Sequence, residues 1–348
     1  MRPGVFPVAS RVQGRPGAGR SRTIFSTVFG LAVVLLAAGC SAAGTGSDAS
    51  ADGLTTLTVA AVPGIDDAPL FIAANDGQFA AEGLKVQIRD YGSASSEIMA
   101  LKTGHADVAA GDYADFLYAQ YHQKGLLVVA EGYDAVSGVM GVLVSQGSGI
   151  TTPKRLAGKT IGTPEPQEIP YSASIPYSLE TLATQSVLQD DGVNPASVKW
   201  KPMPTPDLIG ALSSHKVAAI LVSEPYIYRA ESEIGASELV DSVSGTTANL
   251  PLSGYFTSAS FARTHASALD AFRATLQKVQ PVANKGAAVR STITRSVGMN
   301  AQTAALVTIG DYQTSPDVNG LQRVADLLVD FGVIATPLHI QNMIFRER

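Results

Sequence analysis

From Leu54 to the C-terminus, the sequence alternates between short apolar runs of strand length and amphipathic stretches of helical length. Such alternation is typical of α/β proteins, whose helices cover the faces of a largely parallel sheet. Strands are expected at residues 57–62, 84–91, 106–111, 126–132, 139–145, 159–163, 197–203 and 217–223. Helices are expected at residues 68–79, 93–103, 174–189, 266–282, 301–311 and 320–331. The pattern predicts an α/β fold.

Two segments of the chain resemble each other. EIMALKTGHADVAAGDY (residues 97–113) and DLIGALSSHKVAAILVSEPY (residues 207–226) each combine an acid-opened helix, a tight turn, a small-residue strand, an acid and a tyrosine. This repetition predicts two similar lobes that present their strand ends to a common crevice. Ligands of open α/β sheets bind at the carboxyl ends of the strands.

The N-terminal segment has the features of a bacterial lipoprotein signal. Five arginines and no acid precede a short apolar run that ends at Cys40, the only cysteine of the chain. The run is shorter than the ~20 apolar residues that span a bilayer, and it suits a cleavable signal. We therefore expect residues 1–39 to be removed, Cys40 to carry a lipid, and residues 40–53 to be a flexible linker. The expected location is extracytoplasmic, anchored to the cell membrane; an ordinary secretory signal or a buried N-terminal helix is the alternative.

The composition argues against several classes of protein. A formal net charge of −5 disfavours nucleic acid as a partner. The five histidines show no metal-ligand spacing, and no nucleophile elbow, phosphate loop or dinucleotide fingerprint is present. We therefore expect no metal, no cofactor and no enzymatic activity.

A series of motifs resembles the substrate-binding lipoproteins of ABC importers, in the branch that serves aliphatic sulfonates, taurine, nitrate and thiamine-pyrimidine precursors. The family's G-x-F-x-x-x-G-L appears as Gly77 to Leu84, its A-L-x-x-G-x-x-D in ALKTGHADVAAGD (residues 100–112), and its E-P-Y/F in SEPY (residues 223–226). SGITTPKRLAGKTIGTP (residues 148–164) is similar to another family stretch, with Arg155 in place of the usual Asp. SHKVAA (residues 214–219) departs from the family's G-x-V/A-D-A.

The resemblance implies a type II periplasmic-binding-protein fold with a ligand cleft between two lobes. Lobe 1 would comprise residues 54–134 plus 245–348, and lobe 2 residues 135–244. The implied function is delivery of a small molecule to an ABC permease and its ATPase by a monomeric receptor that closes like a hinge. The alternatives are an enzyme of pyrimidine or menaquinone biosynthesis on the same fold, and a ligand sensor without transport.

Candidate ligand-binding residues lie in the loops that follow the expected strands. We select Asp66, Asp67, Ser93, Ser95, Asp112, Tyr113, Tyr133, Thr163, Glu165, Glu224 and Tyr226. Helix capping is the alternative role for the two aspartates and Ser93, and a hinge or helix-cap role is the alternative for Glu224. For Tyr133 the alternative is a place in the core or on the surface. These loops carry acids but no Lys or Arg. Because an anion buried among carboxylates is destabilised, an amine-bearing, nitrogen-rich aromatic fits them better than a sulfonate or nitrate.

Overall fold

The computed structural model describes residues 53–165 and 178–346. The predicted signal peptide, Cys40, nearly all of the predicted linker, and the segment 166–177 lie outside the described residues. Within the two described ranges, no helix is both long enough and apolar enough to cross a membrane.

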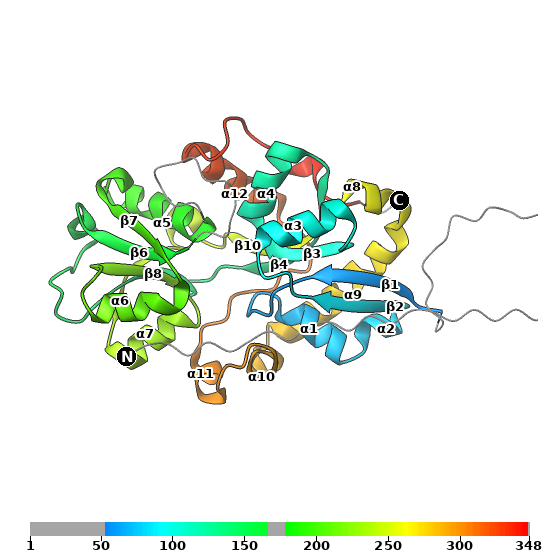
Figure 1. Cartoon of the computed structure of the whole chain (residues 1–348), viewed down its shortest axis with the longest axis horizontal. Coiled ribbons are helices and arrows are strands. Elements are labelled where there is room, and N and C mark those ends of the chain that lie inside the picture. Colours follow the sequence, from blue (N-terminus) through cyan, green and yellow to red (C-terminus); the bar gives the residue numbers. More distant parts are fainter. Residues whose placement is uncertain (1–52, 166–177, 347–348) are drawn as a thin grey trace, which may run out of the picture. The chain divides into compact units, whose positions relative to one another are not determined.

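A first mixed sheet, sheet A, has the strand order β2-β1-β3-β10-β4 (Figure 1). Strand β1 runs parallel to β2 and β3, whereas β10 is antiparallel to both β3 and β4. The strands are β1 (Thr55–Ala60), β2 (Leu84–Arg89), β3 (Val108–Asp112), β4 (Leu126–Asp134) and β10 (Pro251–Ser258). Strand β10 therefore joins parts of the chain that are far apart in sequence.

Helices pack on both faces of sheet A. One face is covered by α1 (Ala68–Asn75), α9 (Ala266–Ala283) and α10 (Ala287–Ser296), and the other by α3 (Ala94–Thr103), α4 (Tyr113–Gln123) and α12 (Val318–Asp330). The alternation of strand side chains explains this arrangement, because neighbouring residues point to opposite faces. On β10, Tyr255 packs against Phe272 of α9, whereas Phe256 stacks on Phe116 of α4 with ring centroids 3.8 Å apart.

A second mixed sheet, sheet B, has the order β7-β6-β8-β5-β9. Its strands are β5 (Met140–Val144), β6 (Thr160–Pro164), β7 (Lys199–Met203), β8 (Ala219–Ser223) and β9 (Ser237–Asp241). Helix α5 (Leu179–Asp190) packs against the core on one face, and α6 (Leu208–Ser213) and α7 (Tyr226–Ile234) pack on the other. On β8, Leu221 belongs to the first of these cores and Val222 to the second.

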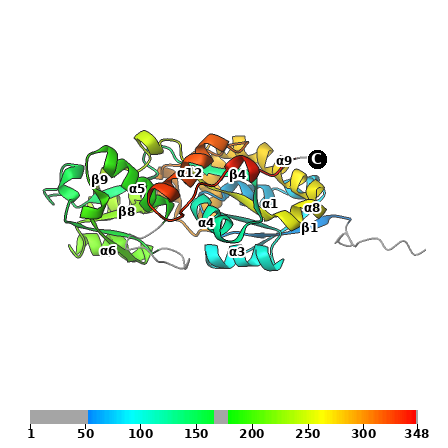
Figure 2. The ribbon, with the colours of Figure 1, turned by 90° about the horizontal axis from the view of Figure 1, so that it is seen from above.

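The chain passes from sheet A to sheet B between Asp134 and Met140, and it returns between Asp241 and Pro251. Helix α12 contacts both α4 and α5, as the view from above also shows (Figure 2). Both sheets belong to one compact unit, Ser47–Arg348. We keep residues 54–134 with 245–348, and residues 135–244, as the proposed lobes.

The α/β prediction is confirmed, but two expected helices are shorter than predicted. The helix expected at 68–79 ends at Asn75, and a separate short helix, α2 (Gln78–Ala81), follows Gly77, whose φ of 70° interrupts the helical path. The helix expected at 301–311 is α11 (Ala301–Leu306), which ends because Val307 is extended and Asp311 pairs with Asp134. The strands β9 and β10 and the helices α4, α7, α8 (Ala259–Thr264) and α10 were not predicted.

Candidate ligand-binding cleft

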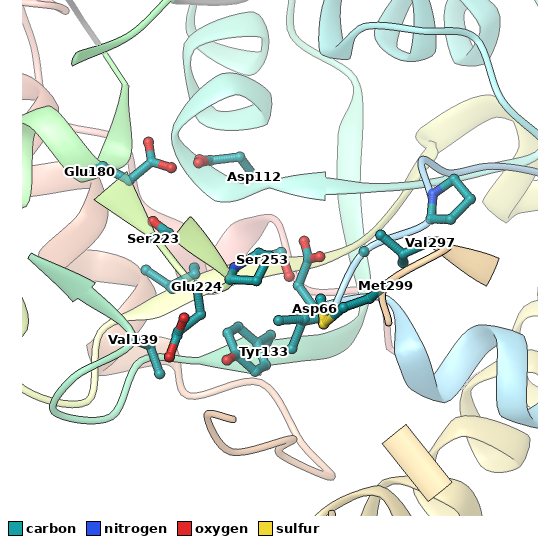
Figure 3. Close-up of a pocket in the computed structure, with 15 residues that line it drawn as sticks. Asp66, Asp112, Tyr133, Val139, Glu180, Ser223, Glu224, Ser253, Val297 and Met299 are labelled. Carbon is teal, nitrogen blue, oxygen red and sulfur yellow. The ribbon is translucent and has the colours of Figure 1, made fainter. Parts of the chain in front are cut away.

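Two adjoining cavities, of about 320 and 400 Å³, open at the carboxyl ends of strands from both sheets. Volumes of this size are ordinary for small-molecule sites. The cavities share seven lining residues and are two ends of one cleft: Pro63, Gly64, Asp66, Asp112, Glu180, Ser223 and Glu224. Figure 3 shows several of these side chains, with the carboxylates of Asp112 and Glu180 pointing toward one another.

The larger cavity is lined on the sheet A side by five carboxylates. Asp66 and Asp67 follow β1, Asp112 ends β3, and Glu97 and Asp115 lie in the first turns of α3 and α4. We call this set the acidic wall. It forms because β1 and β3 are neighbouring parallel strands, so their carboxyl ends and the helices that follow meet at one edge of the sheet.

Burial raises the pKa of every carboxyl of the acidic wall. The pKa of Asp67 is raised well above its ordinary value by burial and by the charges of Asp66 and Glu97. Burial and the nearby charges of Asp115 and Glu180 have the same effect on the pKa of Asp112. The pKa of Asp66 is also raised by burial, and burial with the charge of Glu180 raises the pKa of Asp115 to about 7. Burial therefore favours the protonated forms of these acids when no positive charge compensates them.

Glu97 is the most isolated of these groups. It is 3% exposed, and its Oε1 has no hydrogen-bond partner among the described residues. Burial, with the charges of Asp90, Asp66 and Asp115, raises its pKa to about 8. The Glu97 carboxylate also lies close to the backbone of β3, since a Cβ placed on Gly111 would be 3.5 Å from Oε2.

The acids on the facing side of the cleft differ from the acidic wall in their hydrogen bonds and exposure. Glu224 follows β8, and its two oxygens accept hydrogen bonds from the N–H of Thr308 at 2.9 Å and of Tyr228 at 3.1 Å. Glu180 lies in the first turn of α5, and Glu165 is exposed after β6. We call these three acids the opposite wall. Burial raises the pKa of Glu224, and its two backbone donors oppose that rise.

The smaller cavity ends in apolar and aromatic groups. This cavity is lined by the ring of an aromatic residue near the end of β4 and by Ile65, Val139, Leu252, Val297 and Met299. Figure 3 shows Met299 and Val297 approaching from the segment that follows α10. This end suits an apolar or aromatic part of a ligand.

The aromatic ring at that end belongs to Tyr133, which is fixed by its neighbours. Its hydroxyl accepts a hydrogen bond from the N–H of Gly310 at 2.6 Å, and its ring lies 5.2 Å from that of Tyr312. A Cβ on Gly310 would lie 2.7 Å from Cζ of Tyr133, so glycine is required for this close approach.

Seven of the sequence-predicted site residues line the cleft, and four do not. The residues in the lining are Asp66, Asp67, Asp112, Tyr133, Glu165, Glu224 and Tyr226. The remaining four side chains are used elsewhere. Ser93 caps α3 by accepting from the N–H of Ser96, and Ser95 lines a separate surface depression with Met99.

Tyr113 and Thr163 are absent from the lining because both are fully buried. The Tyr113 hydroxyl donates to Glu131 at 2.5 Å, inside the core of sheet A. Thr163 is fully buried in β6. We leave these four residues out of the proposed site.

Sequence reasoning missed Glu97, Asp115 and Glu180 as lining residues. All three lie in the first turn of a helix, where an acid is usually explained by the helix dipole. The sequence could have indicated them, because the helices that carry them begin at the edge of the sheet where a ligand is expected. Despite the density of acids, no group of three or more His, Cys, Asp or Glu in the described ranges could hold a metal ion.

Solved structures share this fold at low sequence identity. The periplasmic aliphatic sulphonate binding protein SsuA from Escherichia coli matches with a TM-score of 0.68 and 16% identity, over 83% of this chain and 97% of that chain. The alkanesulfonate-binding protein SsuA from Xanthomonas axonopodis pv. citri, bound to MOPS, matches with a TM-score of 0.64 and 16% identity, over 84% and 98%.

A variant of DszB in complex with biphenyl-2-sulfinic acid has a TM-score of 0.62 and 18% identity, over 83% of this chain and 96% of that chain. At such identities the likeness shows the fold, and the predicted periplasmic-binding-protein architecture is confirmed. No curated protein matches the sequence. The NMT1/THI5 like family model matches residues 65–288, more than half of the chain, and the chain therefore belongs to the NMT1/THI5-like family.

Proposed function

We propose that this chain is an extracytoplasmic solute-binding protein that delivers a small molecule to an ABC importer. Two similar structures carry the names of sulfonate-binding periplasmic proteins, and the cleft lies where a hinged receptor would enclose its ligand. The signal-like segment before Cys40 supports export and attachment to the membrane through a lipid. An ABC permease and its ATPase would then be the partners of the ligand-loaded form.

The charge of the cleft supports an amine-bearing, nitrogen-rich ligand, such as a thiamine-pyrimidine precursor, over a sulfonate, taurine or nitrate. This single observation carries the ligand proposal: the described lining contains eight carboxylates and no Lys, Arg or His. Residues 166–177 add no basic residue to the sequence. An anion could bind here only while these acids keep their protons, and binding it beside the ionised carboxylates would cost several kcal/mol; a cationic group favours the ionised form instead. Tyr133 and Tyr226 can pack against an aromatic ring.

Two other functions stay open as outcomes of the test. DszB, which has a similar fold, is named a desulfurization enzyme, and raised carboxyl pKa values also occur in active sites. A sensor that binds the same ligand without importing it would have the same cleft.

The test starts from the full-length protein purified from its own cells. Small molecules released by heat are identified by mass spectrometry, and uptake of the identified molecule is compared between wild-type cells and cells that lack the protein. We expect one unmodified amine-bearing molecule per chain and slower uptake without the protein. Chemical conversion of the molecule by the protein would indicate an enzyme, and unchanged uptake would indicate a sensor.

A further inference from the structure

The acidic wall differs from an ordinary acidic surface because one of its members is buried without a partner. A carboxylate that is 97% buried normally pairs with a base or accepts several hydrogen bonds. Glu97 does neither at Oε1, and it lines the cavity instead of the core. Its side chain therefore offers a strong acceptor to whatever occupies this part of the cleft.

The surroundings of Glu97 restrict the chemistry of that occupant. The charged groups that act on Glu97 are Asp90, Asp66 and Asp115, and Glu97 in turn acts on Asp67. All are acids, and they come from the loops and helices that surround the carboxylate. A neutral donor would satisfy one oxygen but would not offset the negative charge that develops when these acids ionise. A protonated nitrogen satisfies both requirements, since it donates hydrogen bonds and neutralises charge.

The acids of the opposite wall have less need of a positively charged partner. Both oxygens of Glu224 already accept a backbone N–H, and Glu165 is exposed to solvent. Glu224 thus holds the segment at Thr308 in place, although the sequence analysis listed it among the ligand-binding candidates. The strongest unsatisfied acceptor of the cleft lies on the acidic wall.

We infer that Glu97, with Asp66 and Asp67, forms a subsite for a positively charged nitrogen group of the ligand, and that a neutral nitrogen heterocycle alone does not fill it. This inference rests on the proposed receptor function and narrows its ligand to a cation. The apolar end of the cleft, around Tyr133 and Met299, then receives the uncharged part of the same molecule.

A matched pair of probes tests the subsite. The aminomethyl and hydroxymethyl forms of the thiamine pyrimidine differ by one group, which is cationic in the first and neutral in the second. Their affinities for the full chain are measured by calorimetry at neutral pH, with the wild type and the Glu97→Gln variant. We expect the aminomethyl form to bind wild type at least about 10-fold more tightly than the hydroxymethyl form, and the Glu97→Gln variant to lose that preference.

A second arm does not depend on the shape of the ligand. Methylammonium chloride at about 0.1 M is compared with sodium chloride at equal ionic strength by thermal unfolding. The wild type should gain about 2 °C with methylammonium, and Glu97→Gln should gain nothing. Glu238→Gln, which removes a carboxylate of β9 outside the cleft lining, should behave like the wild type in both arms.

The outcomes separate this inference from the receptor function. Equal or tighter binding of the hydroxymethyl form, or a preference that survives in Glu97→Gln, overturns the cationic subsite while leaving a solute-binding protein. Absence of binding by either pyrimidine together with no methylammonium effect also overturns it. In that case the receptor function is judged by the molecule released from the purified protein and by its uptake.

Discussion

Both walls of the cleft carry carboxyl groups, but these groups differ in burial and in their hydrogen bonds. On the acidic wall, carboxylates are buried together and Glu97 lacks a partner at Oε1 among the described residues. On the opposite wall, Glu224 is satisfied by two backbone N–H groups and Glu165 is exposed. By residue type alone the two walls look alike, since both are lined by carboxyl groups. Their hydrogen bonds support the inference that the acidic wall recognises the ligand and that Glu224 helps to hold the cleft together.

The largest expected difference between the walls is in ligand affinity. Asp66→Asn combined with Glu97→Gln should weaken binding of the aminomethyl pyrimidine by at least about 100-fold, because two charge-assisted hydrogen bonds are lost. The matched pair on the opposite wall, Glu165→Gln with Glu180→Gln, should weaken binding less than about 10-fold. Calorimetry on both double variants measures this, and equal losses would break the comparison.

The second difference concerns the pH dependence of stability without ligand. Glu97 has a pKa of about 8 in the folded protein, against an ordinary value of about 4.3 in the unfolded chain. Between these values the folded state holds a proton that the unfolded state has released, so the free energy of unfolding falls as pH rises. Asp115 and Glu131, with pKa values raised to about 7 and about 8, act in the same direction.

Between pH 5 and pH 8, Glu97 alone should lower the free energy of unfolding by roughly 3 kcal/mol, and the other two groups should add to this decrease. Urea unfolding at constant ionic strength measures this decrease. Glu97→Gln should make the dependence shallower, and a stability that rises across this window would contradict the assignment.

The third prediction applies the same substitution to each wall and expects opposite signs. At pH 9, above the pKa of Glu97, Glu97→Gln removes a buried charge that has no partner at Oε1, so it should raise the Tm by a few degrees, which corresponds to about 1–2 kcal/mol. Glu224→Gln leaves one acceptor oxygen for the N–H groups of Thr308 and Tyr228, so it should lower the free energy of unfolding by about 1 kcal/mol and lower the Tm with it. Two changes of the same sign would show that the walls are equivalent.

The smallest effect is expected at the outer edge of the opposite wall. Arg229 lies over the ring of Tyr226 at 5.1 Å and pairs with Glu233, but both charged side chains are well exposed. Arg229→Gln should therefore change the free energy of unfolding by less than about 0.5 kcal/mol and the affinity by less than about 3-fold. A larger loss of affinity would extend ligand recognition to α7.

Sequence reasoning reached the α/β fold and the edge where the cleft lies, because apolar alternation and strand-to-loop order are local properties. It identified Asp66, Asp67 and Asp112 for the same reason, since each directly follows or ends a strand of sheet A. It did not find Glu97, whose role depends on which strands are neighbours and on the absence of a partner. Neither property is visible along the chain.

Strand β10 was missed for a related reason. Its eight residues, Pro251–Ser258, include Ser253, Gly254 and two aromatic residues, and this mixture has no clear alternation of polar and apolar side chains. The strand is buried on both sides between β3 and β4, so both of its faces tolerate apolar groups. The position of such a segment in the tertiary structure, rather than its local propensity, determines whether it forms a strand.

The place of β10 in sheet A also has a consequence for the order of events during synthesis. Strands β3 and β4 follow each other in the chain but do not pair, because β10 is inserted between them. A nascent chain that has not yet reached Pro251 therefore has two unsatisfied strand edges and no completed first sheet. Sheet A, which contains the first strands to be translated, is therefore completed only after all strands of sheet B have been translated.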